Sequence, residues 1–275
     1  MNDISNKSGS KKLIGVFDSG IGGLTVLREI TRLLPSENTV YLGDTARVPY
    51  GSKSKETVER YSIEDANFLV RHNIKLLVTA CNTASAYALK RLKKELDIPV
   101  IGVIEPGARA AVAATKVNKI GVIGTEGTIK SSAYCTAIKS INPAVSTFVK
   151  ACPLFVPLVE EGWADDEVTA VIAARYLKDM KESGIDTLVL GCTHYPLLKE
   201  TIGAIMGKSV TLVDSAASTA NEVKRILTDR GLLNDGNPGE AARKFFVTDS
   251  PERFLNVGRR FFGEGLNQAE LAFLE

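Results

Sequence analysis

Two cysteines stand in matching surroundings along the chain, and a pair of thiols can carry acid–base chemistry. Cys81 lies in LVTACNT, residues 77–83, and Cys192 lies in LVLGCTH, residues 188–194. In each segment an apolar run ends just before the cysteine. A thiolate is both a base and a nucleophile, and nearby charges and helix termini control its formation. We therefore take Cys81 and Cys192 as the candidate catalytic residues. The remaining cysteines lack this context and are interpreted as packing residues.

A glycine-rich turn near the start of the chain is a second candidate. An apolar run leads into Asp18, Ser19 and the glycines of GIGG, residues 20–23. Backbone N–H groups at a helix start attract anions. The dinucleotide pattern needs glycine at its sixth position, where this chain has Thr25, and the Gly-Lys-Ser/Thr nucleotide pattern is missing. A small carboxylate is therefore the expected guest, although Asp18 and Ser19 would also serve as caps of the helix that begins near Gly22.

The elements that must position these residues follow an alternating pattern. Short β-branched runs alternate with amphipathic segments along most of the chain, which indicates α/β units and mostly parallel sheets. The expected strands are residues 13–17, 39–43, 75–80, 99–103, 119–124, 147–151, 187–191, 210–214 and 244–247.

The chain also resembles itself. Ile-Gly-Val at residues 14–16 recurs at 120–122, and the two cysteine segments recur at nearly the same separation. This favours a duplicated α/β unit, with chance similarity between buried strands as the alternative. Ligands of open parallel sheets gather beyond the carboxyl ends of the strands. If the copies face each other, Cys81 and Cys192 flank one cleft from opposite sides.

Two thiols that flank one cleft can invert a stereocentre, because a planar carbanion held between them can be protonated from either face. An ordinary thiol pKa near 8.5 leaves little thiolate at neutral pH, and correcting this costs about 2 kcal/mol. A helix N-terminus or a polar neighbour such as His194 can supply that stabilisation. The alternative is a cysteine hydrolase, in which Cys192 attacks a carbonyl with the help of His194. That reaction needs only one thiol.

Six segments together resemble the aspartate/glutamate racemase superfamily, and they cover nearly the whole chain from residue 13 onward. They are DSGIGGLTVL, YLGDTARVPYGSKS, TACNTASA, GVIGTEGTIKS, PLFVPLVEEG and GCTHYPLL. The VPYG and PLVEEG portions favour the glutamate-specific branch of that superfamily. The resemblance implies interconversion of L- and D-glutamate by two cysteines, without cofactor or metal, which supplies D-glutamate for cell-wall peptidoglycan.

The same resemblance assigns roles to individual residues. Cys81 and Cys192 match the two acid–base residues, and Asp18, Glu160 and His194 match the groups that assist proton movement. Without the resemblance, Glu160 would be interpreted as an exposed acid. The substrate contacts implied by the match are Asp18, Ser19, Pro49, Tyr50, Gly51, Asn82, Thr83, Thr125, Thr128, Thr193 and His194.

The resemblance further implies two pseudo-symmetric, Rossmann-like α/β domains with the active site between them. The C-terminal segment would return to the first domain, which then contains residues 1–104 and 215–275, whereas the second contains 105–214. Residues 1–12 are expected to form a flexible tail. A homodimer is implied by the resemblance alone, as is DNA gyrase as a partner of some family members.

The bulk composition favours small ligands as partners. The 34 basic and 32 acidic residues are spread along the chain and give a net charge of +2, which argues against direct nucleic-acid binding and against attachment to a membrane surface. The polar segment MNDISNKSGSKK lacks the apolar stretch of a secretory signal. Four cysteines without a CxxC pair favour reduced thiols, so we expect a cytoplasmic location.

Other functions remain open beside glutamate racemisation and cysteine hydrolysis. Another racemase of the superfamily would act on aspartate or a related acid. A pyridoxal-phosphate racemase is disfavoured by the repeated thiols, and a zinc or dithiol redox site is disfavoured because the nearest ligand pair is Cys-x-His with no second pair. A binding protein without catalytic activity is the remaining alternative.

Overall fold

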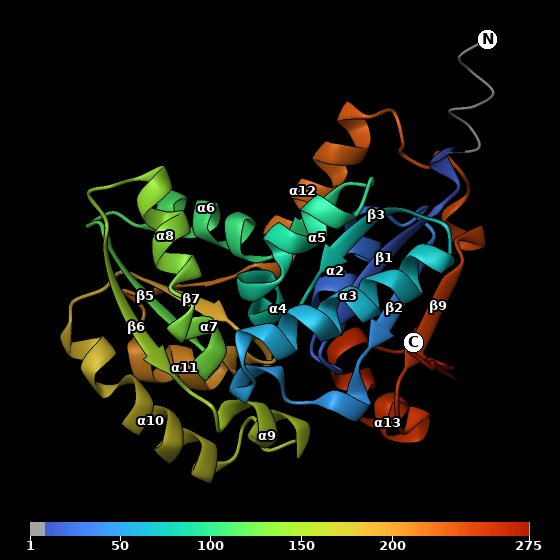
Figure 1. The fold of residues 1–275 in the computed structure, drawn as a ribbon. Helices are drawn as coiled ribbons and strands as arrows, with labels where there is room; N and C mark the ends of the chain where they lie inside the picture. The colour runs from blue at the N-terminus through green and yellow to red at the C-terminus, as the bar shows by residue number, and fades with distance from the viewer. Residues whose placement is uncertain (1–8, 275) are drawn as a thin grey trace.

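Ten strands form two sheets in the computed structural model, which describes residues 9–274 (Figure 1). The paired strands within these residues run parallel. The first sheet has the order β10-β9-β2-β1-β3-β4, and its strands are β1 (Leu13–Asp18), β2 (Thr39–Gly43), β3 (Ile74–Thr79), β4 (Val100–Gly102), β9 (Arg243–Val247) and β10 (Glu270–Leu271). The second has the order β6-β5-β7-β8, with β5 (Lys119–Gly124), β6 (Ser146–Ala151), β7 (Thr187–Gly191) and β8 (Thr211–Asp214).

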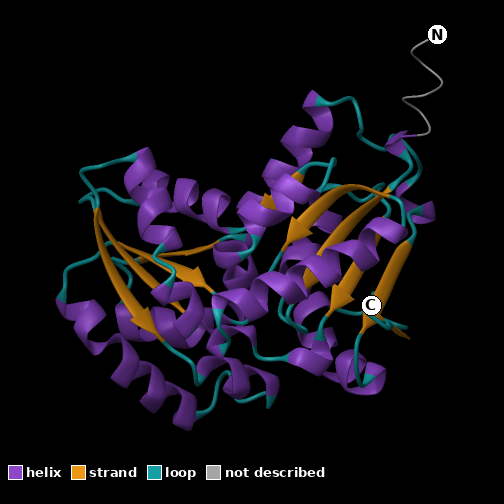
Figure 2. Cartoon of the chain, viewed as in Figure 1, coloured by secondary structure: helices purple, strands orange, loops and turns teal. Residues whose placement is uncertain are grey.

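Each sheet lies between two layers of helices, as the purple and orange elements of Figure 2 show. The first sheet packs against α2 (Leu24–Leu33), α12 (Ala216–Asp229) and α13 (Pro251–Phe262) on one face and α3 (Lys55–Arg71) and α5 (Leu89–Glu95) on the other. The second packs against α10 (Glu167–Glu182) and α11 (Lys199–Met206) on one face and α6 (Ile104–Ala114) and α8 (Ala133–Ile141) on the other. Strands buried on both faces read as continuous apolar runs, which is why the strand pattern was legible in the sequence.

The remaining short helices follow strand ends. They are α4 (Asn82–Tyr87), α7 (Glu126–Lys130) and α9 (Phe155–Glu160), with the 3₁₀ turns η1 (Thr45–Arg47), η2 (Tyr50–Ser52), η3 (Tyr195–Leu198) and η4 (Pro238–Glu240). The expected strands are all found, with ends that differ by at most one residue, and the two-residue β10 was not predicted. The α/β class with parallel sheets is therefore confirmed.

The two sheets repeat one strand order. In the order β2-β1-β3-β4, the first strand of the unit lies between the second and third, and β6-β5-β7-β8 has the same arrangement. The residues compared in the sequence therefore occupy equivalent positions: Asp18 ends a first strand and Thr125 follows one, while Cys81 and Cys192 follow third strands. The expected duplication is visible as this shared topology.

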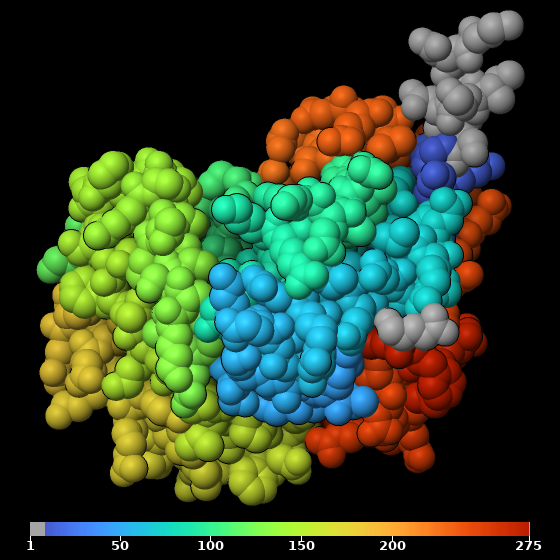
Figure 3. Space-filling view, viewed as in Figure 1, coloured from blue at the N-terminus to red at the C-terminus, as the bar shows by residue number. Residues whose placement is uncertain are grey.

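The C-terminal strands pair with the N-terminal ones, because β9 lies beside β2. Figure 3 shows the blue and green parts of the chain packed against each other on the viewed face. Strand membership does not by itself set domain boundaries, so the division into 1–104 with 215–275 and 105–214 stays a prediction.

The expected N-terminal tail lies in part outside the described residues, at 1–8. Of its remainder, Ser10 is buried, and its carbonyl oxygen accepts a hydrogen bond from the Lys75 ammonium group. Residues 9–12 are therefore attached to the first sheet. Within residues 9–274 no helix has the length and apolar content to cross a membrane.

Candidate active site

The carboxyl ends of the two sheets open onto one cavity of about 420 Å³. In the first sheet Phe17 pairs with Thr79, so β1 and β3 leave the sheet side by side. In the second, Gly124 pairs with Gly191, and β5 and β7 end at the same level. The turns that follow these strands carry the candidate residues into the cavity.

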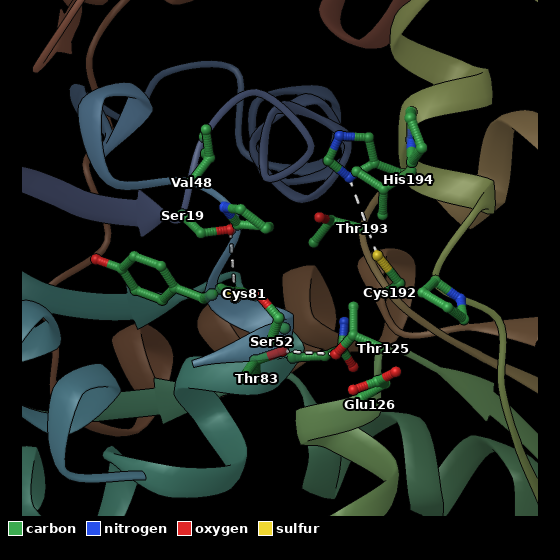
Figure 4. A pocket seen from close by; sticks show the side chains of 18 of the residues that line it. Ser19, Val48, Ser52, Cys81, Thr83, Thr125, Glu126, Cys192, Thr193 and His194 are labelled. Atoms are coloured by element: carbon green, nitrogen blue, oxygen red, sulfur yellow. Dashed lines mark hydrogen bonds between the residues drawn. The ribbon is translucent and has the colours of Figure 1, made fainter. Parts of the chain in front are cut away.

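Most of the predicted residues line this cavity. Cys81 and Cys192 lie across it from each other in Figure 4, the former beside Ser19 and the latter beside His194. The predicted residues along its wall are Ser19, Pro49, Tyr50, Gly51, Cys81, Asn82, Thr83, Thr125, Glu160, Cys192, Thr193 and His194. The cavity therefore holds two thiols contributed by different sheets.

Cys81 is buried in surroundings that favour its neutral thiol. Its Sγ lies 3.6 Å from Ser19 Oγ, to which the thiol donates. Burial and, to a smaller extent, the charge of Asp18 raise the pKa of Cys81 to about 12, against opposing effects of the Ala84 backbone and Ser19. A thiol of this kind is suited to give up a proton only to a strong base.

Cys192 faces a cationic partner instead. Its Sγ lies 3.9 Å from His194 Nδ1, and His194 Nε2 lies 3.0 Å from Glu160 Oε1. Burial alone would lower the pKa of His194, but the contacts with Cys192 and Glu160 outweigh it and raise that pKa to about 10. Burial raises the pKa of Glu160, yet His194 and then Arg253 lower it overall. An imidazolium held by a carboxylate therefore stands beside Cys192.

Asp18 lies behind the cavity wall. Its carboxylate accepts a hydrogen bond from Gly20 N at 3.0 Å and a longer one from Thr193 Oγ1 at 3.5 Å. Burial raises the pKa of Asp18, and His194 and the two backbone donors of the turn only partly offset it. Asp18 thus acts on both cysteine segments without being part of the lining.

Three threonines join the two halves of the site. Thr83 Oγ1 lies 2.8 Å from Thr125 Oγ1 and 3.2 Å from Thr128 Oγ1. Thr125 is also the N-cap of α7, where its hydroxyl accepts from Thr128 N. Thr128 is buried behind this group and does not line the cavity. Hydroxyls gathered without a cation can turn their protons toward a bound carboxylate.

The hydroxyl of Tyr50 points away from the cavity. It donates to Asp44 Oδ2 at 2.5 Å and lies 2.9 Å from Asp65 Oδ2, and Arg47 binds both carboxylates. Tyr50 therefore lines the cavity while its hydroxyl holds the loop through two buried carboxylates.

The glycine-rich turn serves close packing. A Cβ at Gly22 would lie 2.3 Å from Thr193 Oγ1 and 2.5 Å from His194 Nδ1, and one at Gly23 would lie 2.4 Å from Asp18 Cβ. The glycines therefore let the turn between β1 and α2 approach the segment that contains Cys192. Because Gly22 has no side chain, His194 can occupy the space beside the turn. The comparison of this turn with phosphate-binding motifs did not predict this role.

Seven lining residues were not assigned a catalytic or substrate-binding role from the sequence: Gly20, Val48, Ser52, Glu126, Pro153, Val156 and Pro157. The first four adjoin predicted residues. The last three follow β6, so the strand-end rule applied to the expected strand at 147–151 would have indicated them. Among the described residues, no group of three or more His, Cys, Asp or Glu side chains is arranged to hold a metal ion.

Comparison with known proteins gives consistent matches over the whole chain. The sequence pattern of the Asp/Glu/Hydantoin racemase family matches residues 14–223. The glutamate racemase of Geobacter metallireducens is 59% identical over 264 residues, which cover 96% of this chain and 97% of that protein. Among solved structures, glutamate racemase isoform RacE1 of Bacillus anthracis has a TM-score of 0.90 at 42% identity and covers 97% of this chain and 98% of its own. Glutamate racemase of Francisella tularensis in complex with D-glutamate also has a TM-score of 0.90, at 37% identity, with 97% and 99% covered.

Proposed function

The chain belongs to the Asp/Glu/Hydantoin racemase family and is an amino-acid racemase, and we propose that it interconverts L- and D-glutamate by a two-base mechanism. The observation that carries the proposal is the pair of thiols, Cys81 and Cys192, on opposite walls of one cavity. Glutamate is favoured over aspartate because relatives of high identity are glutamate racemases and one of them holds D-glutamate.

The proposed reaction moves one proton at a time. The thiolate of one cysteine takes the Cα proton from one face of glutamate, leaving a carbanion and a thiol. The thiol of the other cysteine then gives its proton to the opposite face, which inverts the stereocentre and leaves a thiolate there. The enzyme is then set for the reverse direction, and proton exchange between the cysteines restores the first form. One Cα–H bond and one S–H bond break, one of each forms, and no other covalent bond changes.

The surroundings of the thiols support an assignment of their resting roles. Cys192, whose Sγ lies 3.9 Å from Nδ1 of the His194 imidazolium, is assigned as the base that takes the first proton, whereas Cys81, with a pKa raised to about 12, is assigned as the acid. Glu160 holds His194 protonated, and the charge of Asp18 helps to keep Cys81 as a neutral thiol. Together these groups place Cys81 beside a carboxylate and Cys192 beside a cation before substrate arrives.

The substrate carboxylates would meet polar groups from both halves. We assign this role to Ser19, Asn82, Thr83, Thr125 and Thr193, with Gly51 and its neighbours supplying backbone groups. Only those donors whose hydrogen bonds strengthen as the carbanion forms lower the barrier to proton transfer, which is high because a Cα proton is far less acidic than a thiol. Thr128 and the Tyr50 phenol act from behind this layer by holding its members in place.

The product would serve the synthesis of cell-wall peptidoglycan, and we propose a cytoplasmic homodimer. All four cysteines are free. The two that we assign to catalysis must stay reduced, which supports a reducing compartment. The resemblance to the family remains the sole support for the dimer and for an interaction with DNA gyrase.

The deciding experiment is incubation of the purified protein with pure L-glutamate in heavy water without added cofactor. Loss of optical rotation should accompany deuterium at Cα of the newly formed D-glutamate. Parallel reactions with L-aspartate separate the two racemases, since the proposal requires a clear preference for glutamate. Racemisation without incorporation of deuterium at Cα would contradict the proton-transfer mechanism.

The two single variants Cys81→Ala and Cys192→Ala test the roles of the thiols. Each should lower kcat by about 10³-fold or more, because each removes an acid or base that no neighbour replaces. Cys135→Ala is the matched control, since Cys135 lies outside the cavity, and it should keep the parent activity. A hydrolase built on Cys192 and His194 would instead survive the loss of Cys81.

A further inference from the structure

Asn82 has an amide group that is only half satisfied. It begins α4 at the end of the turn after β3, is buried and lines the cavity. Its Oδ1 accepts a hydrogen bond from Tyr134, but its Nδ2, although buried, has no hydrogen-bond partner among the described residues. A buried donor without a partner is destabilising, so its presence at a cavity wall points to a ligand that accepts a hydrogen bond from it.

The partner of Asn82 comes from the other half of the molecule. Tyr134 lies on α8, which covers the second sheet, and its ring is part of the apolar cluster there. Its hydroxyl donates to Asn82 Oδ1 at 2.8 Å. Room for this contact depends on glycines, because a Cβ at Gly107 would lie 3.1 Å from the Tyr134 oxygen and one at Gly191 would lie 3.2 Å from its ring.

This bond decides which end of the amide faces the ligand. An asparagine amide can rotate by half a turn and exchange a donor for an acceptor. Oδ1 turned toward a carboxylate would repel it, whereas Nδ2 would donate to it. A phenol that donates to Oδ1 therefore selects the orientation that accepts an anion.

We propose that Tyr134 is a positioning residue for the substrate carboxylate, acting through the amide of Asn82. The inference rests on the proposed racemase function and deepens it. Tyr134 does not line the cavity and does not meet the reacting atoms. Because the Asn82 donor binds the substrate before and during proton transfer alike, its loss should weaken binding and leave the chemical step nearly unchanged.

The test is Tyr134→Phe, which keeps the buried ring and removes only the hydroxyl. The KM for L-glutamate should rise about fivefold to tenfold, as expected for one lost orienting hydrogen bond, while kcat changes by less than about twofold. Tyr176→Phe is the control: its hydroxyl accepts from Leu154 N, neither residue lines the cavity, and its KM should match that of the parent. An unchanged KM in Tyr134→Phe would overturn the inference.

A double-mutant cycle separates positioning from general packing. In an Asn82→Ala background, Tyr134→Phe should have no further effect, because the group it orients is gone. If Asn82→Ala turns over too slowly for a KM, the Kd of D-glutamate from isothermal titration gives the same comparison. Equal effects in both backgrounds would contradict the proposal. An unaltered protein that fails to racemise glutamate would overturn the proposed function itself and this inference with it.

Discussion

At the scale of single residues, the two halves of the site use the same side chain in opposite ways. Cys81 is buried beside the carboxylate of Asp18, which raises its pKa, whereas Cys192 is buried beside the cation of His194. Equal thiols would start from the same protonation state and leave the first step undecided. The repeat in the sequence predicted equivalent positions for the thiols, and spacing also indicated His194 as a neighbour that can stabilise a thiolate. The partner of His194, Glu160, comes from a distant segment, so spacing could not predict it.

The charge of His194 predicts a pH-dependent contribution to stability. Its pKa is about 10 in the folded protein, above the value of about 6.5 for a histidine in an unfolded chain. The stabilisation is therefore fully present below pH 6.5 and is lost as the pH rises through 10. The difference in unfolding free energy between the parent and His194→Gln should shrink by at least about 1 kcal/mol from pH 6 to pH 10. Urea denaturation at both pH values measures it, and a constant difference would argue against an imidazolium beside Cys192.

At the scale of elements, the turn between β1 and α2 packs closely against the Cys192 segment because its glycines have no side chains. Gly22→Ala would place a Cβ against Thr193 and His194, at 2.3 and 2.5 Å from their nearest atoms. We expect a loss of about 1–3 kcal/mol in stability and at least a tenfold fall in kcat/KM, because His194 must move. Gly203→Ala is the control, because Gly203 lies in α11 and the atom nearest to its new Cβ, Leu212 Cδ1, is 3.7 Å away. Helix propensity should make this substitution neutral or stabilising by up to about 1 kcal/mol. Thermal unfolding and racemase assays of both variants decide the matter.

The loop that carries Pro49 and Gly51 into the cavity is fixed by buried charges. Arg47 binds Asp44 at 2.6 Å and Asp65 at 2.9 Å, and neither carboxylate is exposed. Arg47→Met should destabilise the protein by about 3–5 kcal/mol at pH 8 and raise the KM, because it leaves both charges buried without their cation.

The same variant should lose less stability at pH 5. Burial and the charge of Asp44 raise the pKa of Asp65, so this carboxyl can take up a proton there and relieve the repulsion. The control Arg60→Met removes an exposed arginine that lies 4.0 Å from Glu64, and it should cost at most about 1 kcal/mol. Chemical denaturation at both pH values is the measurement, and a loss that is larger at pH 5 would contradict this account of Asp65.

At the scale of the whole molecule, the sequence predicted the strands and helices of each layer better than the contacts that join distant segments. Apolar runs such as residues 119–124 predict buried parallel strands because both faces are covered, and the strand ends then place Cys81 and Cys192. The contacts that join distant segments are less legible, since they depend on polar residues that usually lie at the surface. Lys75 is such a residue: it interrupts the apolar run of β3 and yet is almost fully buried.

Lys75 ties the N-terminal end of the described chain and the loop after α12 to the first sheet. Its ammonium group lies 2.6 Å from Glu37 Oε2 and donates to the carbonyl oxygens of Ser10 and Leu232, while Glu37 Oε1 accepts from Asn234 N. Burial lowers the pKa of Lys75, and the contact with Glu37 opposes this effect. Removing the charge of Lys75 therefore leaves the charge of Glu37 buried without an ion-pair partner.

Lys75→Met should accordingly cost about 3–5 kcal/mol of unfolding free energy, because the Glu37 carboxylate is left buried without its partner. Lys75→Met combined with Glu37→Gln should recover at least about 1 kcal/mol, since the amide keeps an acceptor for Asn234 and carries no charge. The cavity is remote from this pair, so kcat and KM at low temperature should stay within about twofold of the parent in both variants. If the double variant were less stable than Lys75→Met alone, a buried charge at Glu37 would not be the source of the instability, and this account of the ion pair would be wrong.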